Sequence, residues 1–231
     1  MQRKHYIIVI LVALIGFGGY FFLLQTGQGN EQANENLTFP QLEDEADGER
    51  IVEMETSMGT IKIRLFEDQA PKAVENFLTH SEDGYYDGTI FHRIVPDTVM
   101  IGGDPTGTGR GGESIYGEFF EDEISKELYN LRGAVAMHNS GPNTNTSQFF
   151  IVQNKEVDEK HIKGMEEAGY PEEIIEAYKV RGGAPWLDGV HTVFGQVIEG
   201  MDVVEKICSV EVDKNQRPLE EVKIEKITVI Q

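Results

Sequence analysis

The stretch IVEMETSMGTIKIRLF, residues 51–66, holds two short alternating segments separated by Ser57-Met58-Gly59. In both segments apolar residues recur at every second position, which is the period of a strand with one buried face. Two such segments joined by a short link that contains glycine predict a β-hairpin. We therefore expect the folded domain to begin near Ile51 with two antiparallel strands.

The rest of the chain repeats this strand signal at short intervals. A helix is expected to start at Pro71, which suits a first turn, and to stop at Gly84; a second covers residues 201–207. Residues 102–117 hold seven glycines and predict a long loop. Many short strands with two core helices indicate a closed antiparallel barrel or a sandwich. The further strands are expected at residues 89–95, 133–138, 148–153, 192–198 and 222–230.

The segment FHRIVP, residues 91–96, places a charged side chain inside an apolar run. In a regular strand Phe91, Arg93 and Val95 share one face. A buried or half-buried arginine lowers stability by several kcal/mol unless another group pairs with it. Arg93 is therefore a candidate functional residue.

The composition limits the classes of partner. The 231 residues suffice for one domain with a sizeable core, and 20 basic against 40 acidic residues give a formal net charge of −20. This charge argues against nucleic acid as a partner. Cys208 is the single cysteine, so the chain cannot form an internal disulfide.

The first 50 residues differ from the rest. Residues 6–24 form an uncharged apolar run preceded by Arg3 and Lys4, which predicts a transmembrane anchor with residues 1–5 in the cytoplasm and the domain outside the cell membrane. The alternative is a signal peptide whose cleavage releases a secreted domain. Residues 25–50 are rich in Gln, Asn, Gly and acidic residues and predict a flexible acidic linker that buries nothing.

Residues 155–184 are highly charged and have apolar residues at helical spacing on both sides of Gly169-Tyr170-Pro171. They predict a helical hairpin inserted between two strands. Two interpretations remain open for it: a surface decoration, or an element that docks a partner or grips a substrate.

No familiar constellation for bond cleavage or metal binding is present. The sequence lacks G-x-S-x-G and H-E-x-x-H, and its six histidines have no metal-ligand spacing, so we expect neither a metal nor another cofactor. GTGRGG, residues 107–112, resembles a phosphate loop but precedes neither a lysine nor a helix start.

Three segments combine aromatic, amide and histidine side chains with one arginine and no nucleophile: FHRIVP (91–96), MHNSGPNTNTSQFFI (137–151) and PWLDGVHTVFGQV (185–197). Such a set suits a groove that holds a peptide without cleaving it. In their order and approximate spacing, five segments of the chain resemble the cyclophilin-type peptidyl-prolyl isomerases. The resemblance covers nearly all of a domain at residues 51–231, interrupted mainly by residues 155–184. It implies a mainly β fold, a closed eight-stranded antiparallel barrel capped by two helices, with the groove on its outside. The segments are FHRI (91–94), GGDPTGTG (102–109), GGESIYGEFFEDE (111–123), GPNTNTSQFFI (141–151) and WLDGVHTVFGQV (186–197).

The resemblance also implies roles for single residues. Arg93 matches the catalytic arginine, Gln148 the amide that positions it, and Phe150 the floor of the proline pocket. The other substrate-binding residues that it implies are Leu187 and His191 in the pocket walls, Trp186 at the rim, Asn139 with its neighbours His138 and Ser140 beside the bound peptide, and Gly109 in a nearby loop.

The segment TVMI, residues 98–101, departs from the family pattern. Thr98 replaces a pocket phenylalanine, Val99 a methionine, and Ile101 a glutamine that contacts the arginine and the substrate. We expect a pocket with less aromatic surface, an arginine with one orienting partner fewer, and weak binding of cyclosporin-type ligands.

Three functions follow as hypotheses. The first is a peptidyl-prolyl isomerase that acts on proline-containing polypeptides outside the cytoplasm and assists the folding of exported proteins. The second is a membrane-tethered module that binds proline peptides with little turnover. The third is an acidic scaffold that uses residues 155–184 to bind a membrane partner.

Overall fold

The computed structural model describes residues 37–44 and 48–231. The predicted transmembrane segment, residues 6–24, lies outside this part of the chain. Within the described residues, no helix combines the length and the apolar character that a membrane crossing requires.

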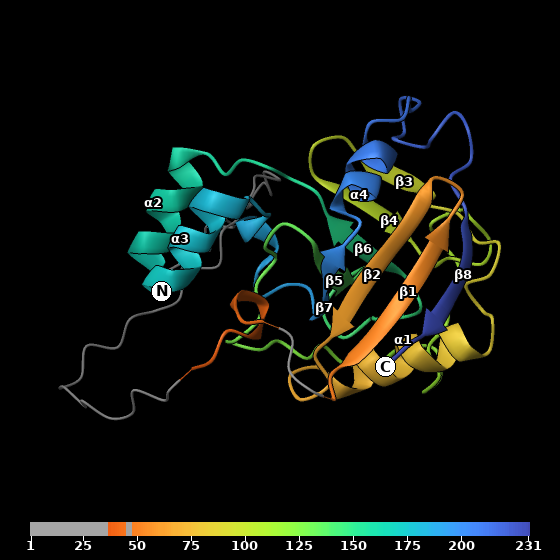
Figure 1. Ribbon diagram of the computed structural model, residues 1–231, viewed down its shortest axis with the longest axis horizontal. Helices are drawn as coiled ribbons and strands as arrows, with labels where there is room; N and C mark the ends of the chain where they lie inside the picture. The colour runs from red at the N-terminus through yellow and green to blue at the C-terminus, as the bar shows by residue number, and fades with distance from the viewer. Residues whose placement is uncertain (1–36, 45–47) are drawn as a thin grey trace, which may run out of the picture. The chain divides into compact units, whose positions relative to one another are not determined.

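Eight antiparallel strands form one sheet in the order β3–β4–β6–β5–β7–β2–β1–β8 (Figure 1). The eight antiparallel strands that the resemblance implies are confirmed. The closed barrel is not shown: the outer strands β3 and β8 form no ladder with each other, so the sheet is a cyclophilin-like half-barrel. Ile90, before β3, bridges to Lys223, before β8, and the Phe91 N–H donates to the Val222 carbonyl at 3.0 Å. The strands are β1 Arg50–Thr56, β2 Gly59–Leu65, β3 Arg93–Val95, β4 Val99–Gly102, β5 Ala134–Met137, β6 Phe149–Val152, β7 Val193–Glu199 and β8 Ile224–Val229.

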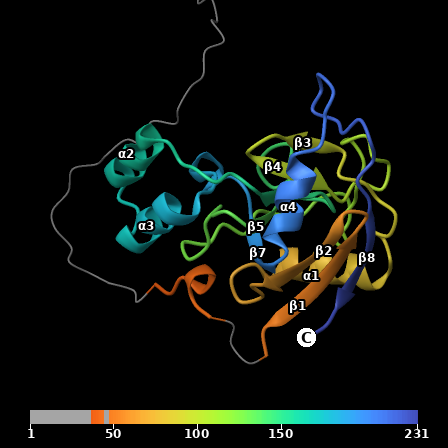
Figure 2. The same cartoon turned by 45° about the horizontal axis from the view of Figure 1, so that its top comes forward.

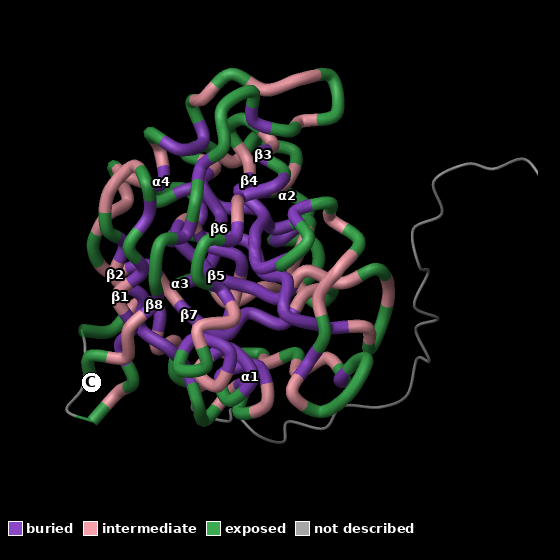
Figure 3. The backbone as a smooth tube through the Cα atoms, turned by 90° about the vertical axis from the view of Figure 1, so that its right-hand side faces the viewer, coloured by how far each residue is buried: buried purple, intermediate pink, exposed green. Residues whose placement is uncertain are grey.

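The inner face of the sheet and the two predicted core helices enclose the main hydrophobic core. Helix α1 spans Pro71–Glu82 and helix α4 spans Met201–Cys208; they lie toward opposite ends of the strands in Figure 1. Val74 and Phe77 of α1 and Val204 and Ile207 of α4 belong to the same buried cluster. Figure 3 shows the buried residues concentrated along the strands, with exposed residues in the surrounding loops.

Two details differ from the predictions. Strand β3 is only Arg93–Val95, and Phe91 lies in the inner core together with Ile94, so Phe91 and Arg93 do not share a face. The reason is that residues 90–92 follow an irregular path with a single bridge at Ile90. Strand β4 was not predicted, because all four of its residues are buried and it therefore lacks the polar alternation of a half-exposed strand.

Residues 37–44, which we call the strap, pack onto the domain although the sequence assigns them to a linker that buries nothing. A short 3-10 helix, Pro40–Leu42, places the Gln41 side chain in the interior, 4% exposed. Gln41 Nε2 donates to the Tyr129 carbonyl and to Gln196 Oε1, both at 2.9 Å, and Gln41 Oε1 accepts from the Tyr129 N–H at 2.7 Å. For the strap, the expectation is therefore wrong.

The strap also completes the surroundings of a buried cation. Arg64 of β2 is only 2% exposed, and its guanidinium donates to the carbonyls of Pro40 and Glu43 and lies 3.3 Å from the Glu49 carboxylate. A buried charge is tolerated only when it is paired and its hydrogen bonds are satisfied. The strap supplies two of these acceptors.

We expect Gln41→Ala to lower the free energy of unfolding by about 1–3 kcal/mol, since it leaves buried groups of Tyr129 and Gln196 without partners. Chemical denaturation measures this change. Gln69→Ala, which removes one hydrogen bond to Glu127, is the control and should change stability by less. Equal effects of the two substitutions would show that the strap does not contribute to stability.

Residues 155–184 contain two helices, α2 Glu159–Ala168 and α3 Glu172–Arg181, between β6 and β7. Figure 2 shows both helices beside the sheet, away from β1 and β8. Asp158 caps α2 by accepting from the His161 N–H at 2.9 Å, and Gly169 ends it at a φ of 75°. The helices share a separate core: Leu131, Ile162, Met165, Ile174, Ile175, Ala177 and Tyr178, with Phe39 and Leu42 of the strap against it.

Asp188 links this hairpin to the barrel. Its carboxylate accepts from the Asn130 N–H at 2.7 Å, from Asn130 Nδ2 at 3.0 Å and from the Tyr178 hydroxyl of α3 at 2.7 Å. Burial raises the pKa of Asp188 above its ordinary value. One partly buried acidic side chain thus holds both the loop before β5 and helix α3.

Candidate active site

Five residues form a row across the outer face of the sheet. In the strand register Arg93 lies opposite Ile101, Ile101 opposite Phe150, Phe150 opposite Ala136, and Ala136 opposite Val193. Neighbouring strands are about 4.8 Å apart, so the backbones of Arg93 and Phe150 are roughly 10 Å apart. The row begins with a cation and continues with apolar side chains.

The apolar part of this row belongs to a cluster on the outer face, distinct from the inner core. Phe150 is 2% exposed and Ile101 4%, and the partly buried Leu187 packs against them. The imidazole of His191 meets the Phe150 ring edge-on, with 5.2 Å between the ring centroids. The cluster comprises Phe66, Val99, Ile101, Leu128, Ala134, Ala136, Phe150, Val152, Ala184 and Val193.

A hollow of about 550 Å³ lies at the Arg93 end of the row. Arg93 is exposed there, and its Nε donates to Gln216 Oε1 at 2.9 Å. Four of the predicted site residues line the hollow: Arg93, Ile101, Gly109 and His138. Its other lining residues are His92, Thr108, Arg110, Asp213, Asn215 and Arg217.

The glycine-rich loop beside the hollow is folded around Asp104. This buried carboxylate accepts backbone N–H groups from five residues, Thr106, Thr108, Gly109, Arg110 and Gly111, at 2.7–3.1 Å. Burial alone would raise the pKa of Asp104, but these hydrogen bonds outweigh it and lower the pKa. The N–H groups that would hold a phosphate in a nucleotide-binding loop are thus engaged by the protein itself.

Gly109 has two reasons to be glycine. Its φ is 78°, in the left-handed region, and a Cβ built there would lie 3.2 Å from Cδ2 of the His92 imidazole. The close contact fits its predicted place beside the groove.

Gln148 is placed differently from the prediction. Its Nε2 donates to the Gly111 carbonyl at 2.7 Å, and its buried Oε1 has no hydrogen-bond partner among the described residues. The amide that holds Arg93 in this structure is that of Gln216.

Trp186 also departs from its predicted place at the rim of the pocket. Its indole is 43% exposed and lies against His161 of α2, with 5.0 Å between the ring centroids. Trp186 and Leu187 are neighbours in the short 3-10 helix Pro185–Leu187, whose side chains point in different directions. Leu187 therefore joins the Phe150 cluster, and Trp186 faces the hairpin.

Asn139, Ser140 and Thr98 lie outside the strands, and Val99 begins β4. The amide of Asn139 donates to Asp122 Oδ1 at 3.2 Å and to the Val190 carbonyl at 3.3 Å. The exposed Ser140 donates its N–H to Thr144 Oγ1 at 3.0 Å. Thr98 Oγ1 donates to the Pro96 carbonyl at 3.3 Å, in the turn before β4, and Val99 is buried in the outer cluster.

Three histidines near the hollow have lowered pKa values. Burial, followed by the nearby His191, His92 and Arg93, lowers the pKa of His138 to about 4. Burial is also the largest cause for His92 and for His191, whose ring stacks on that of His138 with 6.4 Å between the centroids. The imidazoles are therefore uncharged at neutral pH, and the positive charge beside the row belongs to arginines.

These histidines make stability depend on pH. A folded pKa below the ordinary 6.5 means that the unfolded chain binds more protons, so stability falls as pH drops from about 6.5 toward the folded value of about 4 for His138. When the pH falls from about 7.5 to about 5, the free energy of unfolding of the unaltered protein should decrease by roughly 1–2 kcal/mol more than that of His138→Gln. Chemical denaturation at both pH values tests this. The same pH dependence in both proteins would contradict a lowered pKa for His138.

The residues of the loop between α4 and β8 that reach the site were not predicted from the sequence. Asp213, Asn215 and Arg217 line the hollow, and Gln216 contacts Arg93. Asp213 and Asn215 are ordinary turn residues, so the sequence could have indicated a turn there. Nothing in the segment indicates that the turn lies against a strand more than 100 residues earlier.

The chain is similar in sequence to proteins of one known family. Residues 51–229 match the family model described as "Cyclophilin type peptidyl-prolyl cis-trans isomerase/CLD". A Staphylococcus epidermidis protein that carries the name of a peptidyl-prolyl cis-trans isomerase is 54% identical over 192 residues, 83% of this chain and 98% of that protein. A Staphylococcus aureus protein with the same name is 52% identical with the same coverage.

Solved structures of the same family are similar to this chain in fold and sequence. A crystal structure of a cyclophilin type peptidyl-prolyl cis-trans isomerase from Cryptosporidium parvum has a TM-score of 0.65 and 37% identity, covering 79% of this chain and 98% of that one. The structure of that protein in the presence of the dipeptide Ala-Pro has a TM-score of 0.64 and 37% identity, covering 78% of this chain and 99% of that one.

Proposed function

Because the chain belongs to the cyclophilin-type peptidyl-prolyl cis-trans isomerase family, we propose that it accelerates rotation about Xaa-Pro bonds in exported polypeptides and assists their folding. The family membership and the mainly β, cyclophilin-like fold confirm the resemblance drawn from the five sequence segments. The export of its substrates, the roles of single residues and the membrane anchor are proposals.

The reaction requires no nucleophile. Rotation about an Xaa-Pro bond faces a barrier of about 20 kcal/mol, because resonance gives the C–N bond partial double-bond character. An enzyme lowers this barrier by binding the twisted amide more tightly than either planar form. In the twisted amide the proline nitrogen regains a lone pair, which can accept a hydrogen bond from a cation.

Arg93 is suited to donate that hydrogen bond. An arginine stays protonated and presents several donors in a fixed plane. The Arg93 side chain is exposed at the end of the row, and among the residues that the structure describes only its Nε is engaged, by Gln216. The remaining guanidinium N–H groups are then available to the substrate nitrogen.

The observation that carries this proposal is the row itself. It places a cation two strands away from a buried aromatic ring on the outer face of the sheet, with Ile101 between Arg93 and Phe150. A proline ring over Ile101 and Phe150 would hold its amide nitrogen toward Arg93. His191 and Leu187 border the same apolar surface and form its walls.

We expect the pocket to favour small prolyl contacts over large ligands. Val99 and Ile101 supply aliphatic surface, and Thr98 bonds to its own turn, so the walls offer little aromatic area. Weak binding of cyclosporin-type ligands follows from the same composition.

The location of the enzyme is proposed from sequence. Residues 6–24 anchor the chain in the cell membrane and place the isomerase domain on its outer side. Treating intact cells or spheroplasts with protease tests this topology. Protection of the domain until the membrane is dissolved would place it in the cytoplasm.

One observation favours a second candidate, a tethered module that binds proline peptides with little turnover. Ile101 lies directly opposite Arg93 and has no polar atom to orient it, and Gln148 bonds to Gly111 instead. Isomerisation of an Xaa-Pro peptide by the full chain, followed by a protease-coupled assay or by exchange NMR, separates the two functions. Peptide binding without turnover would establish the binding module.

A further inference from the structure

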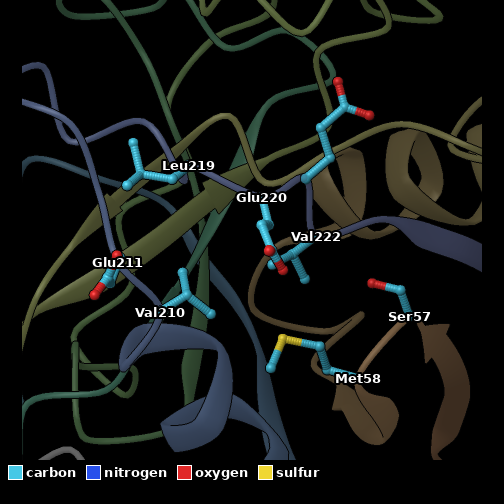
Figure 4. Close-up of a pocket in the computed structure, with 8 residues that line it drawn as sticks. Ser57, Met58, Val210, Glu211, Leu219, Glu220 and Val222 are labelled. Atoms are coloured by element: carbon cyan, nitrogen blue, oxygen red, sulfur yellow. The ribbon is translucent and has the colours of Figure 1, made fainter.

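The loop between α4 and β8, residues 209–223, reaches from one end of the barrel to the candidate active site. Its base surrounds a hollow of about 800 Å³, shown in Figure 4, in which Val210, Glu211 and Leu219 face Met58 and Ser57 of the β1–β2 turn. Its tip, residues 213–217, lines the hollow beside Arg93. The tip of the loop therefore forms one wall of the candidate active site, and the strands of the sheet form none of this wall.

The tip has a defined conformation. The Gln216 N–H donates to the Asp213 carbonyl at 2.9 Å, and the Asp213 N–H donates to the Arg217 carbonyl at 2.8 Å. Asp213 Oδ1 accepts from the Arg217 N–H at 3.0 Å. This turn holds Gln216 at a φ of 65°, which is uncommon for a residue other than glycine.

In this conformation Gln216 holds strand β3 at two points. Its backbone carbonyl accepts from the Ile94 N–H at 2.8 Å, and its side-chain Oε1 accepts from Arg93 Nε at 2.9 Å. Arg217 extends the contact by donating from Nη1 to the Gly107 carbonyl at 2.6 Å. The tip is thus joined both to the strand that carries Arg93 and to the glycine-rich loop.

The other neighbours of Arg93 leave its orientation to Gln216. Ile101, its partner across the ladder, is aliphatic, and the amide of Gln148 bonds to Gly111. Among residues 37–44 and 48–231, the one hydrogen bond of the Arg93 side chain is the one to Gln216. A long side chain without any fixed contact would populate several rotamers.

We propose that Gln216 is the positioning residue of Arg93, and that it supplies from the α4–β8 loop the orienting contact that Ile101 cannot make. The inference rests on the proposed catalytic role of Arg93. Gln216 binds the Nε edge of the Arg93 guanidinium. The Nη groups of Arg93 then point toward the bound prolyl nitrogen. It acts through Arg93 and touches no substrate atom.

The test compares kcat and KM of full-length variants on one Xaa-Pro peptide. Gln216→Gly removes the amide and tolerates the positive φ, and Gln216→Asn keeps an amide that is too short to reach. We expect both to lower kcat about 5- to 50-fold with little change in KM, because misplacing a catalytic group affects the transition state. Lys214→Ala, an exposed side chain in the same loop, is the control and should retain full activity.

Rescue distinguishes positioning from a general structural role. Ile101→Gln places an amide directly opposite Arg93 on the same face of the sheet. In the Gln216→Gly background, Ile101→Gln should raise kcat at least about threefold. Gln216→Glu, whose carboxylate also accepts from Arg93 Nε, should have a kcat close to that of the unaltered protein.

Three outcomes overturn the proposal. Unchanged kcat in Gln216→Gly shows that Arg93 needs no such partner, and increased kcat shows that Gln216 holds Arg93 away from the substrate. A loss that Ile101→Gln fails to reduce at all assigns Gln216 to loop structure. Arg93→Ala, measured in parallel, separates this failure from that of the proposed function: if it retains full activity, the catalytic role of Arg93 is itself wrong.

Discussion

Replacing Arg93 with alanine is expected to lower kcat/KM on an Xaa-Pro peptide at least about tenfold, and to leave the midpoint of unfolding almost unchanged. The guanidinium stabilises the twisted amide and not the planar substrate, so the loss should fall on kcat. Stability should hold because Arg93 is exposed at the end of β3 and packs in neither hydrophobic cluster.

Two further variants make this result specific. Arg93→Lys keeps the charge without the planar array of donors and should recover only part of the activity. Arg50→Ala removes another exposed arginine, at the start of β1, whose Nε lies 3.9 Å from the Glu67 carboxylate. This variant should have the activity of the unaltered protein. Full activity in Arg93→Ala would exclude the proposed mechanism.

The largest expected loss of stability comes from Asp188→Ala, about 3–5 kcal/mol in the free energy of unfolding. The substitution leaves the N–H and amide of Asn130 and the hydroxyl of Tyr178 without an acceptor in the interior. Each unsatisfied buried group lowers stability by about 1–3 kcal/mol. The contact between helix α3 and the barrel should weaken first.

Two further variants distinguish the hydrogen bonds of Asp188 from the general effect of removing an acidic side chain. Tyr178→Phe removes one of the three hydrogen bonds and should lower stability by about 1–2 kcal/mol. Asp68→Ala removes an exposed carboxylate and should have little effect. Urea denaturation measures the stability of all three variants. An Asp188→Ala protein as stable as Asp68→Ala would mean that the hydrogen bonds of Asp188 do not stabilise the packing of helix α3.

Much of the fold could be predicted because local periodicity determines it. The alternation in residues 51–66 gives β1 and β2, and Pro71 and Gly84 mark the limits of α1 to within two residues. Strand β4 escaped prediction because both of its faces are covered, which removes the polar alternation. Phe91 was assigned to the wrong face because the prediction assumed a regular strand through residues 90–92.

The site was predictable to the extent that family motifs mark single residues. Arg93, Ile101 and Phe150 were named from sequence, and the register then places them in one row. The contacts that orient them could not be predicted. The Gln216 amide reaches Arg93 across 123 positions, and the Gln41 amide reaches Tyr129 across 88, and neither residue stands in a motif.

The strap has a consequence for how far the domain can travel if residues 6–24 are anchored in a membrane. Because the strap is fastened to the domain from Phe39 to Leu42, the chain between residue 24 and the strap comprises residues 25–36 and not residues 25–50. A chain spans at most about 3.6 Å per residue, so the maximum reach falls from roughly 90 Å to roughly 40 Å. The catalyst would then work in a thin layer above the bilayer and meet polypeptides close to the point at which they emerge.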